Sequence, residues 1–210
     1  MDVTRAEIVG GVRSESMIQK IYKLALEGYD NGCHDWYFEG LQEVKALANS
    51  RGGTIEDWAF LLSVYSPRVS VSRAARLALQ HFQNPNVKPS GAMEKIYQTA
   101  IKYRDRGFMN GKKTEAFRKA ILSGGGCNSL VLDVHMAKAL EVDQSAMYRV
   151  WLYEHIEATI LDVQSRLIDD GIELTVSQLQ AAIWGGQLLS IGWDISKRAL
   201  VPSDVLGVEV

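Results

Sequence analysis

The sequence predicts an all-α protein with about nine helices. Apolar residues recur every three or four positions along most of the 210 residues, and no segment shows the alternation that predicts a strand. Capping residues and glycines stand where these periodic segments begin and end. With 47% hydrophobic residues, the chain can bury a core as one large domain or as two small lobes that share a cleft.

The N-terminal part is expected to form three helices after a flexible arm. Residues 1–13 have no apolar period and contain two adjacent glycines, which predicts the arm. A first amphipathic helix covers residues 14–27 and is expected to stop at Gly28; a second helix ends before Gly52. Thr54 is the expected cap of a third helix, which is nearly apolar throughout and therefore buried.

Two helices at about 70–82 and 92–103 lead into the stretch where we expect the chemistry. There, a short turn ending at Gly111 precedes two lysines and a helix through Ile121. After a glycine-rich connector, Asp133 stands within an apolar run, where a carboxylate is costly to desolvate unless it has hydrogen-bond donors or a task. Capping of the following helix would explain this residue type, and it would not exclude catalysis.

The C-terminal part is expected to contain the longest helix, over residues 143–170, and a last helix that begins with a capping box at Thr175. His155 on the long helix is interpreted as a partly buried histidine rather than a ligand. Trp184 on the last helix is interpreted as a core residue. Residues 203–210 are expected to form a frayed tail.

Composition narrows the class of protein. Cys33 and Cys127 are far apart and fit no zinc or disulfide-rich pattern, so we expect no metal and a reduced, intracellular setting. No run approaches the 18 apolar residues that predict a membrane-spanning helix, and the N-terminus lacks the order of a secretory signal. We therefore expect a soluble, cytoplasmic protein without a membrane partner.

The charge is unevenly distributed along the chain. A net charge of −2 argues by itself against a nucleic-acid partner. However, residues 68–119 contain twelve Lys and Arg against three acids, whereas the remainder has eleven basic and twenty-two acidic residues. This polarity indicates one positive face that could neutralise phosphates. The alternative is a set of solvated helix faces that happen to be basic.

Two short motifs resemble the helix-hairpin-helix DNA glycosylases. The residues from Gly111 through Lys113 to Thr114 are similar to the G-x-K-T part of that family's hairpin, although Phe108 and Met109 replace its proline and first glycine. The segment Leu132-Asp133-Val134-His135 resembles the family's V-D-x-H, and Lys113 and Asp133 are 20 residues apart, close to the family's spacing. Upstream, the segment from Leu61-Leu62-Ser63 to Ala74 is similar to a family segment whose turn lies near the DNA and the base pocket.

The resemblance implies a glycosylase-like fold, with two helical lobes around a cleft in a single domain over residues 14–202 and the hairpin at about 105–123. The N- and C-terminal helices would form one lobe and the middle helices the other. The implied function is DNA repair by base excision, in which a damaged or modified base is flipped out and removed, with or without AP-lyase activity. By position, Lys113 would attack the sugar C1′, and Asp133 would activate it and stabilise the cationic sugar.

The implied partner is double-stranded DNA, which would make the protein nucleoid-associated. No cofactor is expected, and the iron–sulfur cluster of some glycosylases is excluded because no cysteine follows Cys127. The candidate DNA-binding residues are Asn110, Gly111, Lys112, Thr114, Arg68, Arg73, Arg118 and Lys119. The candidate pocket residues are Ser63, Tyr65, Ser66 and His135.

Three alternatives remain open. The first is a base-modifying transferase of the same fold, similar to phage-type proteins that modify DNA bases, which would need a small-molecule co-substrate. The second is a catalytically silent DNA-binding or inhibitory protein, for which Asp133→Asn should preserve function. The third is an unrelated helical protein in which Asp133 only caps a helix.

Overall fold

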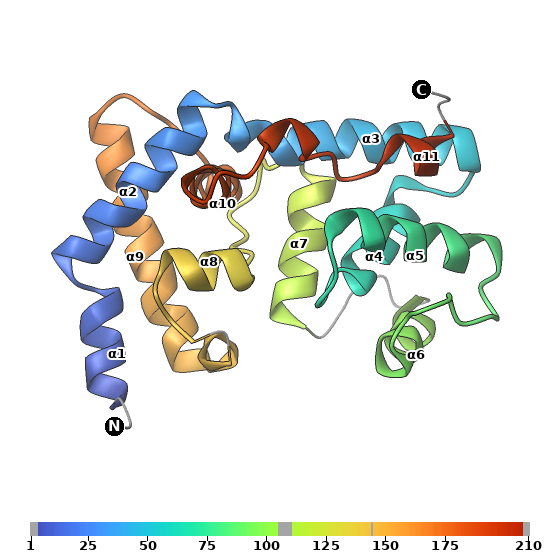
Figure 1. The fold of residues 1–210 in the computed structure, drawn as a ribbon, viewed down its shortest axis with the longest axis horizontal. Helices are drawn as coiled ribbons and strands as arrows, with labels where there is room; N and C mark the ends of the chain where they lie inside the picture. The colour runs from blue at the N-terminus through green and yellow to red at the C-terminus, as the bar shows by residue number, and fades with distance from the viewer. Residues whose placement is uncertain (1–3, 105–110, 144, 208–210) are drawn as a thin grey trace. The chain divides into compact units, whose positions relative to one another are not determined.

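The computed structural model describes residues 4–104, 111–143 and 145–207. Within these ranges the protein has eleven α-helices, three short 3-10 helices and no strand, so the all-α prediction is confirmed (Figure 1). The two α-helices beyond the predicted nine lie near the chain ends. They are α1 (Arg5–Val12) and α11 (Ser203–Leu206).

The chain divides into two compact units. Unit 1 comprises Met1–Trp36 and Gly125–Lys197, and unit 2 comprises Tyr37–Gly124 and Arg198–Val210. The chain therefore passes from one unit to the other three times.

Unit 1 is built around a single buried helix, α10 (Val176–Ser190). Every residue from Val176 to Leu188 except Gln178 is buried, and α10 lies between α2 and α8 and also contacts α9 (Figure 1). A helix that is apolar on nearly all sides needs such cover. The other elements of unit 1 are α1, α2 (Glu15–Asp30), η1 (Cys33–Asp35), α8 (Val134–Ala139), η3 (Ala146–Tyr148), α9 (Val150–Asp169) and η4 (Ile195–Lys197).

Helices α2 and α10 approach closely enough that only glycine fits at their crossing. A Cβ atom on Gly28 would lie 1.9 Å from the carbonyl oxygen of Ala182, and one on Gly186 would lie 2.0 Å from that of Leu24. The prediction that Gly28 ends the first helix is therefore wrong. The helix continues to Asp30, and Gly28 is a packing residue inside it.

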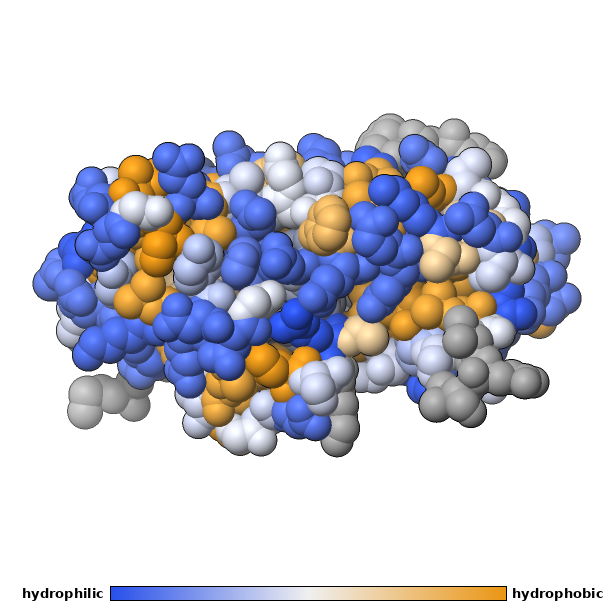
Figure 2. Space-filling view, turned by 90° about the horizontal axis from the view of Figure 1, so that it is seen from above, coloured by the Kyte–Doolittle hydropathy of each residue, from blue (hydrophilic) through white to orange (hydrophobic). Residues whose placement is uncertain are grey.

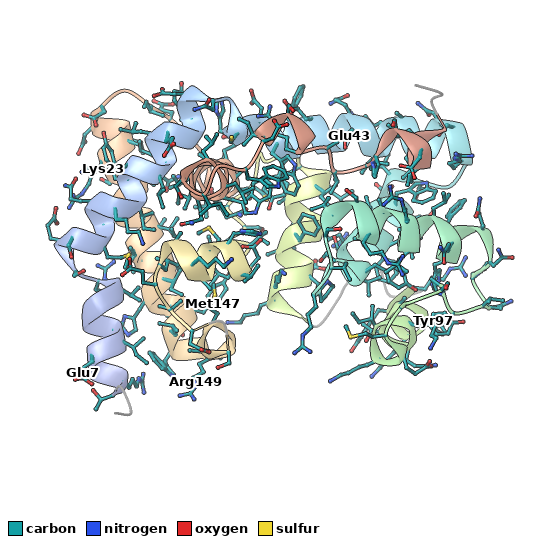
Figure 3. All side chains as sticks on the ribbon, in the orientation of Figure 1. Glu7, Lys23, Glu43, Tyr97, Met147 and Arg149 are labelled. Atoms are coloured by element: carbon teal, nitrogen blue, oxygen red, sulfur yellow. The ribbon has the colours of Figure 1, made fainter. Side chains whose placement is uncertain are left out.

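The predicted flexible arm over residues 1–13 instead contains α1. Thr4 and Glu7 form a capping box at its start, in which the Glu7 side chain (labelled in Figure 3) accepts a hydrogen bond from the Thr4 N–H at 2.7 Å. Val12 at the other end is buried in the core of unit 1. The apolar periodicity of the sequence does not predict this helix, because it contains two exposed glycines. The helix is stabilised by its cap and by one buried end.

Unit 2 is built around the apolar helix α4 (Ile55–Tyr65). All residues from Trp58 to Tyr65 are buried, as predicted, and Thr54 forms a capping box with Asp57. Helix α4 contacts α5, α6 and α7. The other helices of the unit are α3 (Trp36–Arg51), α5 (Val71–Gln83), α6 (Glu94–Tyr103), α7 (Lys112–Leu122) and α11.

The expected frayed tail is also corrected over its described part, residues 203–207. Asp204 of α11 accepts hydrogen bonds from Arg76, with the Nε to Oδ2 distance at 3.0 Å, and the Val205 carbonyl accepts one from Arg51 Nε at 3.2 Å. Just before α11, the Val201 N–H donates to Glu43 of α3 at 2.7 Å (Figure 3). These partners are far apart in sequence, so no local pattern could predict them.

The face shown in Figure 2 is mostly hydrophilic, and apolar residues form separate patches on it. Across the described parts of the chain, no helix is both long and apolar enough to cross a membrane.

Candidate functional site

Asp133 is the N-cap of α8, which confirms the capping interpretation. One carboxylate oxygen, Oδ1, accepts hydrogen bonds from the backbone N–H groups of His135 and Met136, both at 2.9 Å. The other oxygen, Oδ2, has no hydrogen-bond partner among the described residues, and the side chain is half-buried. The cap therefore fixes the carboxylate through one oxygen and leaves the second available.

The segment before Asp133 is anchored in the core of unit 1. Leu130, Val131 and Leu132 are all buried. The Leu130 carbonyl accepts a hydrogen bond from the Tyr153 hydroxyl at 2.9 Å. Because backbone on both sides of Asp133 is held, its carboxylate has little freedom to move.

His135 joins Asp133 to an aromatic cluster in the same unit. Its ring stands at 87° to that of Trp184, with centroids 6.1 Å apart, and its Nδ1 atom is buried without a partner in the described chain. Trp184 also stacks on Trp36 at 5.1 Å and meets the edge of Trp193 at 6.2 Å. We call Trp36, Trp184 and Trp193 the tryptophan cluster. The interpretation of Trp184 as a core residue is confirmed. No sequence pattern pointed to Trp193.

The described part of the hairpin lies in unit 2 at the start of α7. Gly111 is the N-cap residue, and α7 begins without a side-chain cap, with Lys112 and Lys113 as its first two residues. The Thr114 hydroxyl donates to the Gly111 carbonyl at 3.0 Å, so it stabilises the turn. Asn110 and the rest of the predicted hairpin back to residue 105 lie outside the described residues.

The predicted DNA-binding cations fall into two groups. Arg118 makes a two-pronged ion pair with Glu115, at 2.8 and 3.0 Å, and Arg73 donates to the Ser90 carbonyl at 2.9 Å. Both guanidinium groups are therefore held by the protein itself. The side chains of Arg68 and Lys119 are exposed and have no ion pair or hydrogen bond within the described ranges.

Arg68 also has an uncommon backbone conformation. Its φ is 62°, in the left-handed region that favours glycine, at the turn between α4 and α5. A non-glycine residue there costs about 1–2 kcal/mol. Such strain at an exposed basic turn is more common at functional sites than elsewhere.

The predicted pocket residues of unit 2 lie at the C-terminal end of α4, where Ser63 and Tyr65 are buried and Ser66 is the half-buried C-cap. Ser63 is fully buried and its hydroxyl has no partner in the described residues, while the Ser66 hydroxyl donates to the Ser63 carbonyl at 2.9 Å. The hydroxyl of Tyr65 is 2.8 Å from Nδ1 of His81. The ring of His81 meets the edge of Tyr97, which is labelled in Figure 3, with centroids 5.7 Å apart.

Burial controls the protonation of this pair. Desolvation is the main cause that raises the pKa of the Tyr65 hydroxyl above its ordinary value. Tyr97 makes a smaller contribution in the same direction. Desolvation lowers the pKa of His81, and the positive charge of Arg104 lowers it further. A neutral His81 can then accept the hydrogen bond from Tyr65 at Nδ1. His81 was missed in the sequence because a histidine on an amphipathic helix gives no sign of its distant partner.

The division into units also separates the charge. Unit 2 contains fifteen Lys and Arg and nine Asp and Glu, a net charge of +6. Unit 1 contains eight Lys and Arg and sixteen Asp and Glu, a net charge of −8. The basic stretch found in the sequence therefore lies wholly in unit 2.

The predicted site residues are divided between the units as well. Asp133 and His135 belong to unit 1, close to the tryptophan cluster. Lys113, the other predicted catalytic residue, belongs to unit 2 together with the predicted DNA-binding residues and the remaining pocket residues.

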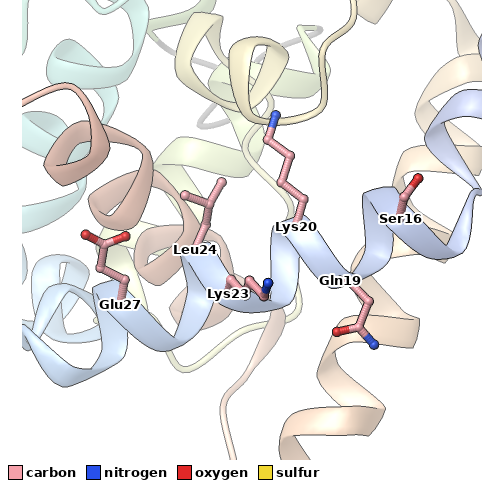
Figure 4. Close-up of a pocket in the computed structure, with 6 residues that line it drawn as sticks. All are labelled: Ser16, Gln19, Lys20, Lys23, Leu24 and Glu27. Atoms are coloured by element: carbon pink, nitrogen blue, oxygen red, sulfur yellow. The ribbon is translucent and has the colours of Figure 1, made fainter.

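A separate surface depression lies along α2 in unit 1 (Figure 4). It has a volume of about 440 Å³ and contains none of the predicted site residues. Lys20 on its wall makes an ion pair with Glu141 at 2.7 Å. The lining residues are Ser16, Gln19, Lys20, Lys23, Leu24 and Glu27. No group of three or more potential metal ligands occurs within the described residues.

These features define an all-α protein with an acidic and a basic unit and a fixed, half-buried carboxylate in the acidic one. The chain belongs to a family of unknown function (DUF7178), whose model matches residues 4–185. No curated protein and no solved structure matches the chain.

Proposed function

We propose that the protein is a DNA glycosylase that flips a damaged or modified base out of the duplex and cleaves its N-glycosidic bond. The observation that carries this proposal is the geometry of Asp133. Oδ1 is fixed by two backbone N–H groups at 2.9 Å, and Oδ2 has no partner in the described chain. A carboxylate held in this way needs little reorganisation when positive charge develops beside it.

The chemistry requires such a group. Loss of the base leaves a sugar with oxocarbenium character, and a nearby carboxylate stabilises that charge. The half-buried position of Asp133 strengthens the electrostatic effect, because the carboxylate is partly shielded from water. The resemblance of Leu132-Asp133-Val134-His135 to the V-D-x-H motif supports the same role.

Features of unit 2 support a DNA partner. Its net charge of +6 attracts phosphates. The uncapped start of α7 carries Lys112, and a helix N-terminus of this kind suits a phosphate group. Arg68 and Lys119 add exposed cations without partners in the described residues.

The arrangement of the chain supports a glycosylase-like fold. In the glycosylases that the motifs resemble, the N- and C-terminal helices form one lobe and the middle helices form the other. Unit 1 here combines Met1–Trp36 with Gly125–Lys197, and the middle of the chain forms most of unit 2.

The first experiment measures base release from duplexes that each contain one damaged or modified base. Asp133→Asn keeps an oxygen for the helix cap and removes the charge, so the variant should fold and lose at least about 100-fold in rate. Asp143→Asn changes an exposed carboxylate of the same unit and should keep full activity. Equal rates for the Asp133→Asn and native proteins would overturn the assignment of Asp133.

A second experiment tests whether the enzyme is also a lyase. A neutral lysine amine can attack C1′ of an abasic sugar, and loss of water then gives a Schiff base that borohydride traps. The trapped adduct should disappear in Lys113→Ala and persist in Lys119→Ala. An adduct that survives in Lys113→Ala would remove Lys113 from this role, and no adduct with the native protein would leave a monofunctional glycosylase.

The second candidate is a DNA-binding protein without catalysis. It is favoured by the fact that capping alone accounts for one oxygen of Asp133, while the basic charge of unit 2 suffices for binding. This candidate predicts salt-sensitive DNA binding that Asp133→Asn leaves unchanged, and no base release from any substrate. Mass spectrometry of the DNA after incubation with small-molecule co-substrates would detect a base-modifying transferase instead.

A further inference from the structure

Trp193 is held in a defined position at the end of α10. The Gly192 N–H donates to the Leu189 carbonyl at 2.8 Å, and the Trp193 N–H donates to the Leu188 carbonyl at 3.0 Å. With φ of 74° at Gly192, this is a Schellman motif, in which glycine takes the left-handed position. The backbone of Trp193 is thus fixed before any ligand arrives.

The indole of Trp193 contacts Trp184 and is partly exposed. Its ring meets Trp184 at 6.2 Å and 65°, and Trp184 is itself stacked on Trp36. The exposed fractions of Trp36 and Trp184 are 7% and 9%, whereas that of Trp193 is 37%. Core packing explains the first two residues, but it does not explain why a rigidly placed Trp193 remains accessible.

His135 adds an unsatisfied polar atom to this cluster. His135, whose ring packs against Trp184, has a buried Nδ1 atom without a hydrogen-bond partner in the described residues. Buried polar atoms nearly always have a hydrogen-bond partner in the protein or in ordered water. The exposed Trp193 and an unsatisfied ring nitrogen therefore belong to one aromatic cluster.

The charge of unit 1 selects among planar ligands. Its net charge is −8, and Asp194 directly follows Trp193. A phosphate group would be repelled here, while an uncharged aromatic base would not. Stacking of bases on aromatic side chains contributes about 1–3 kcal/mol per base.

We propose that Trp193 is a stacking site for a nucleobase and that unit 1 binds a nucleoside in preference to the corresponding nucleotide. The choice of a nucleobase among planar ligands rests on the proposed function. Preference for the uncharged form rests on the charge of unit 1 alone.

The test titrates the full chain with free nucleosides and with their 5′-monophosphates, with calorimetry for affinity and the indole N–H signals in NMR for location. The nucleoside should shift the Trp193 signal, and its monophosphate should bind several-fold more weakly, with the difference shrinking as salt is added. Trp193→Ala should weaken nucleoside binding about tenfold, and Trp193→Phe should restore most of it.

Trp151→Ala is the matched control, because Trp151 is half-buried in the same unit and its ring is covered by Arg5 at 4.8 Å. This variant should bind nucleosides normally. Nucleosides that leave the Trp193 signal unmoved up to their solubility limit would overturn the stacking site. Tighter binding of the monophosphate would overturn the preference for the uncharged form.

The outcomes separate this inference from the proposed function. Base release from a duplex without any nucleoside binding at Trp193 would overturn the inference alone. Nucleoside binding that depends on Trp193, with no base release from any duplex, would overturn the proposed function alone.

Discussion

Gly28 and Ala182 bring the backbones of α2 and α10 into direct contact, because a Cβ atom on Gly28 would lie 1.9 Å from the Ala182 carbonyl oxygen. Gly186 repeats the relationship from the other helix, facing the Leu24 carbonyl. Neither obstacle is the far end of a flexible side chain, so neither can move aside. The packing of α2 against α10 in unit 1 therefore depends on the absence of a Cβ atom at Gly28 and Gly186.

Gly28→Ala should lower the free energy of unfolding by about 2–3 kcal/mol, because the added methyl group pushes the two helices apart. Urea denaturation measures the change. Gly10→Ala is the control, since Gly10 lies in α1 with nothing within 4 Å of its position. That substitution should raise stability by about 0.5–1 kcal/mol. Similar effects at the two glycines would contradict the close contact.

Asp133→Ala should lower the free energy of unfolding by about 1 kcal/mol, because two backbone N–H groups of α8 lose their acceptor. Asp133→Asn keeps an acceptor and should change stability by less than about half of that amount. Thermal unfolding followed by circular dichroism compares the two variants. If Asn proves as destabilising as Ala, the carboxylate charge rather than the cap stabilises α8.

Arg68→Gly should raise the free energy of unfolding by up to about 1 kcal/mol, because glycine tolerates the φ of 62° found there. DNA affinity should fall at the same time, since an exposed cation is lost. Glu141→Gly is the comparison, because Glu141 has a φ of 54° and carries the opposite charge. Denaturation of both variants measures the effect of backbone strain on stability, and DNA-binding titrations measure the effect of the lost charge on affinity. Unchanged DNA affinity in Arg68→Gly would show that Arg68 does not contact DNA.

Lys119→Ala should reduce the salt dependence of DNA binding by about one phosphate contact, a change of roughly 0.9 in the slope of log K against log salt. Arg118→Ala should change this slope by less than half as much, because Glu115 already holds the guanidinium. Its main effect should be lower stability. Binding titrations over a series of salt concentrations measure the slope for each variant. A larger change in slope for Arg118→Ala than for Lys119→Ala would show that Arg118 leaves Glu115 to bind DNA.

His81 should make the protein less stable in mild acid. Desolvation first, and Arg104 second, lower the pKa of His81 below its ordinary value of 6.5. The unfolded chain therefore binds the proton more readily than the folded one. This contribution to stability is complete above pH 6.5 and is lost as the pH falls from there towards the lower pKa of the folded state.

The measurement is urea denaturation at a series of pH values for the native protein and for His81→Gln. The variant loses the hydrogen bond with Tyr65 at all pH values, so its stability should be lower but flatter below pH 6.5. An unchanged pH profile in His81→Gln would assign the acid sensitivity to another group.

Local chemistry explains which features the sequence could predict. Thr54, Asp133 and Thr175 were recognised as helix caps because each bonds to N–H groups within three residues of itself. The burial of α4 could be predicted as well, because its apolar residues form one continuous run in the sequence. Such features need no knowledge of the tertiary fold.

The features that the sequence could not predict all depend on distant partners. Gly28 resembles a helix stop until Ala182 is packed against it. Arg73 resembles a phosphate contact until its bond to the Ser90 carbonyl is seen. The position of the Trp193 ring becomes clear only from its contact with Trp184.

The interleaved chain has a consequence for folding during synthesis. Helix α2 ends at Asp30, but α10, which covers its apolar face, is complete only at Ser190. At ordinary rates of translation, the two helices leave the ribosome on the order of 10–30 s apart. The helices of unit 2 from α3 to α7 are made during that interval. Unit 2 therefore has time to collapse first, while the apolar face of α2 remains a target for chaperones until the last third of the chain emerges.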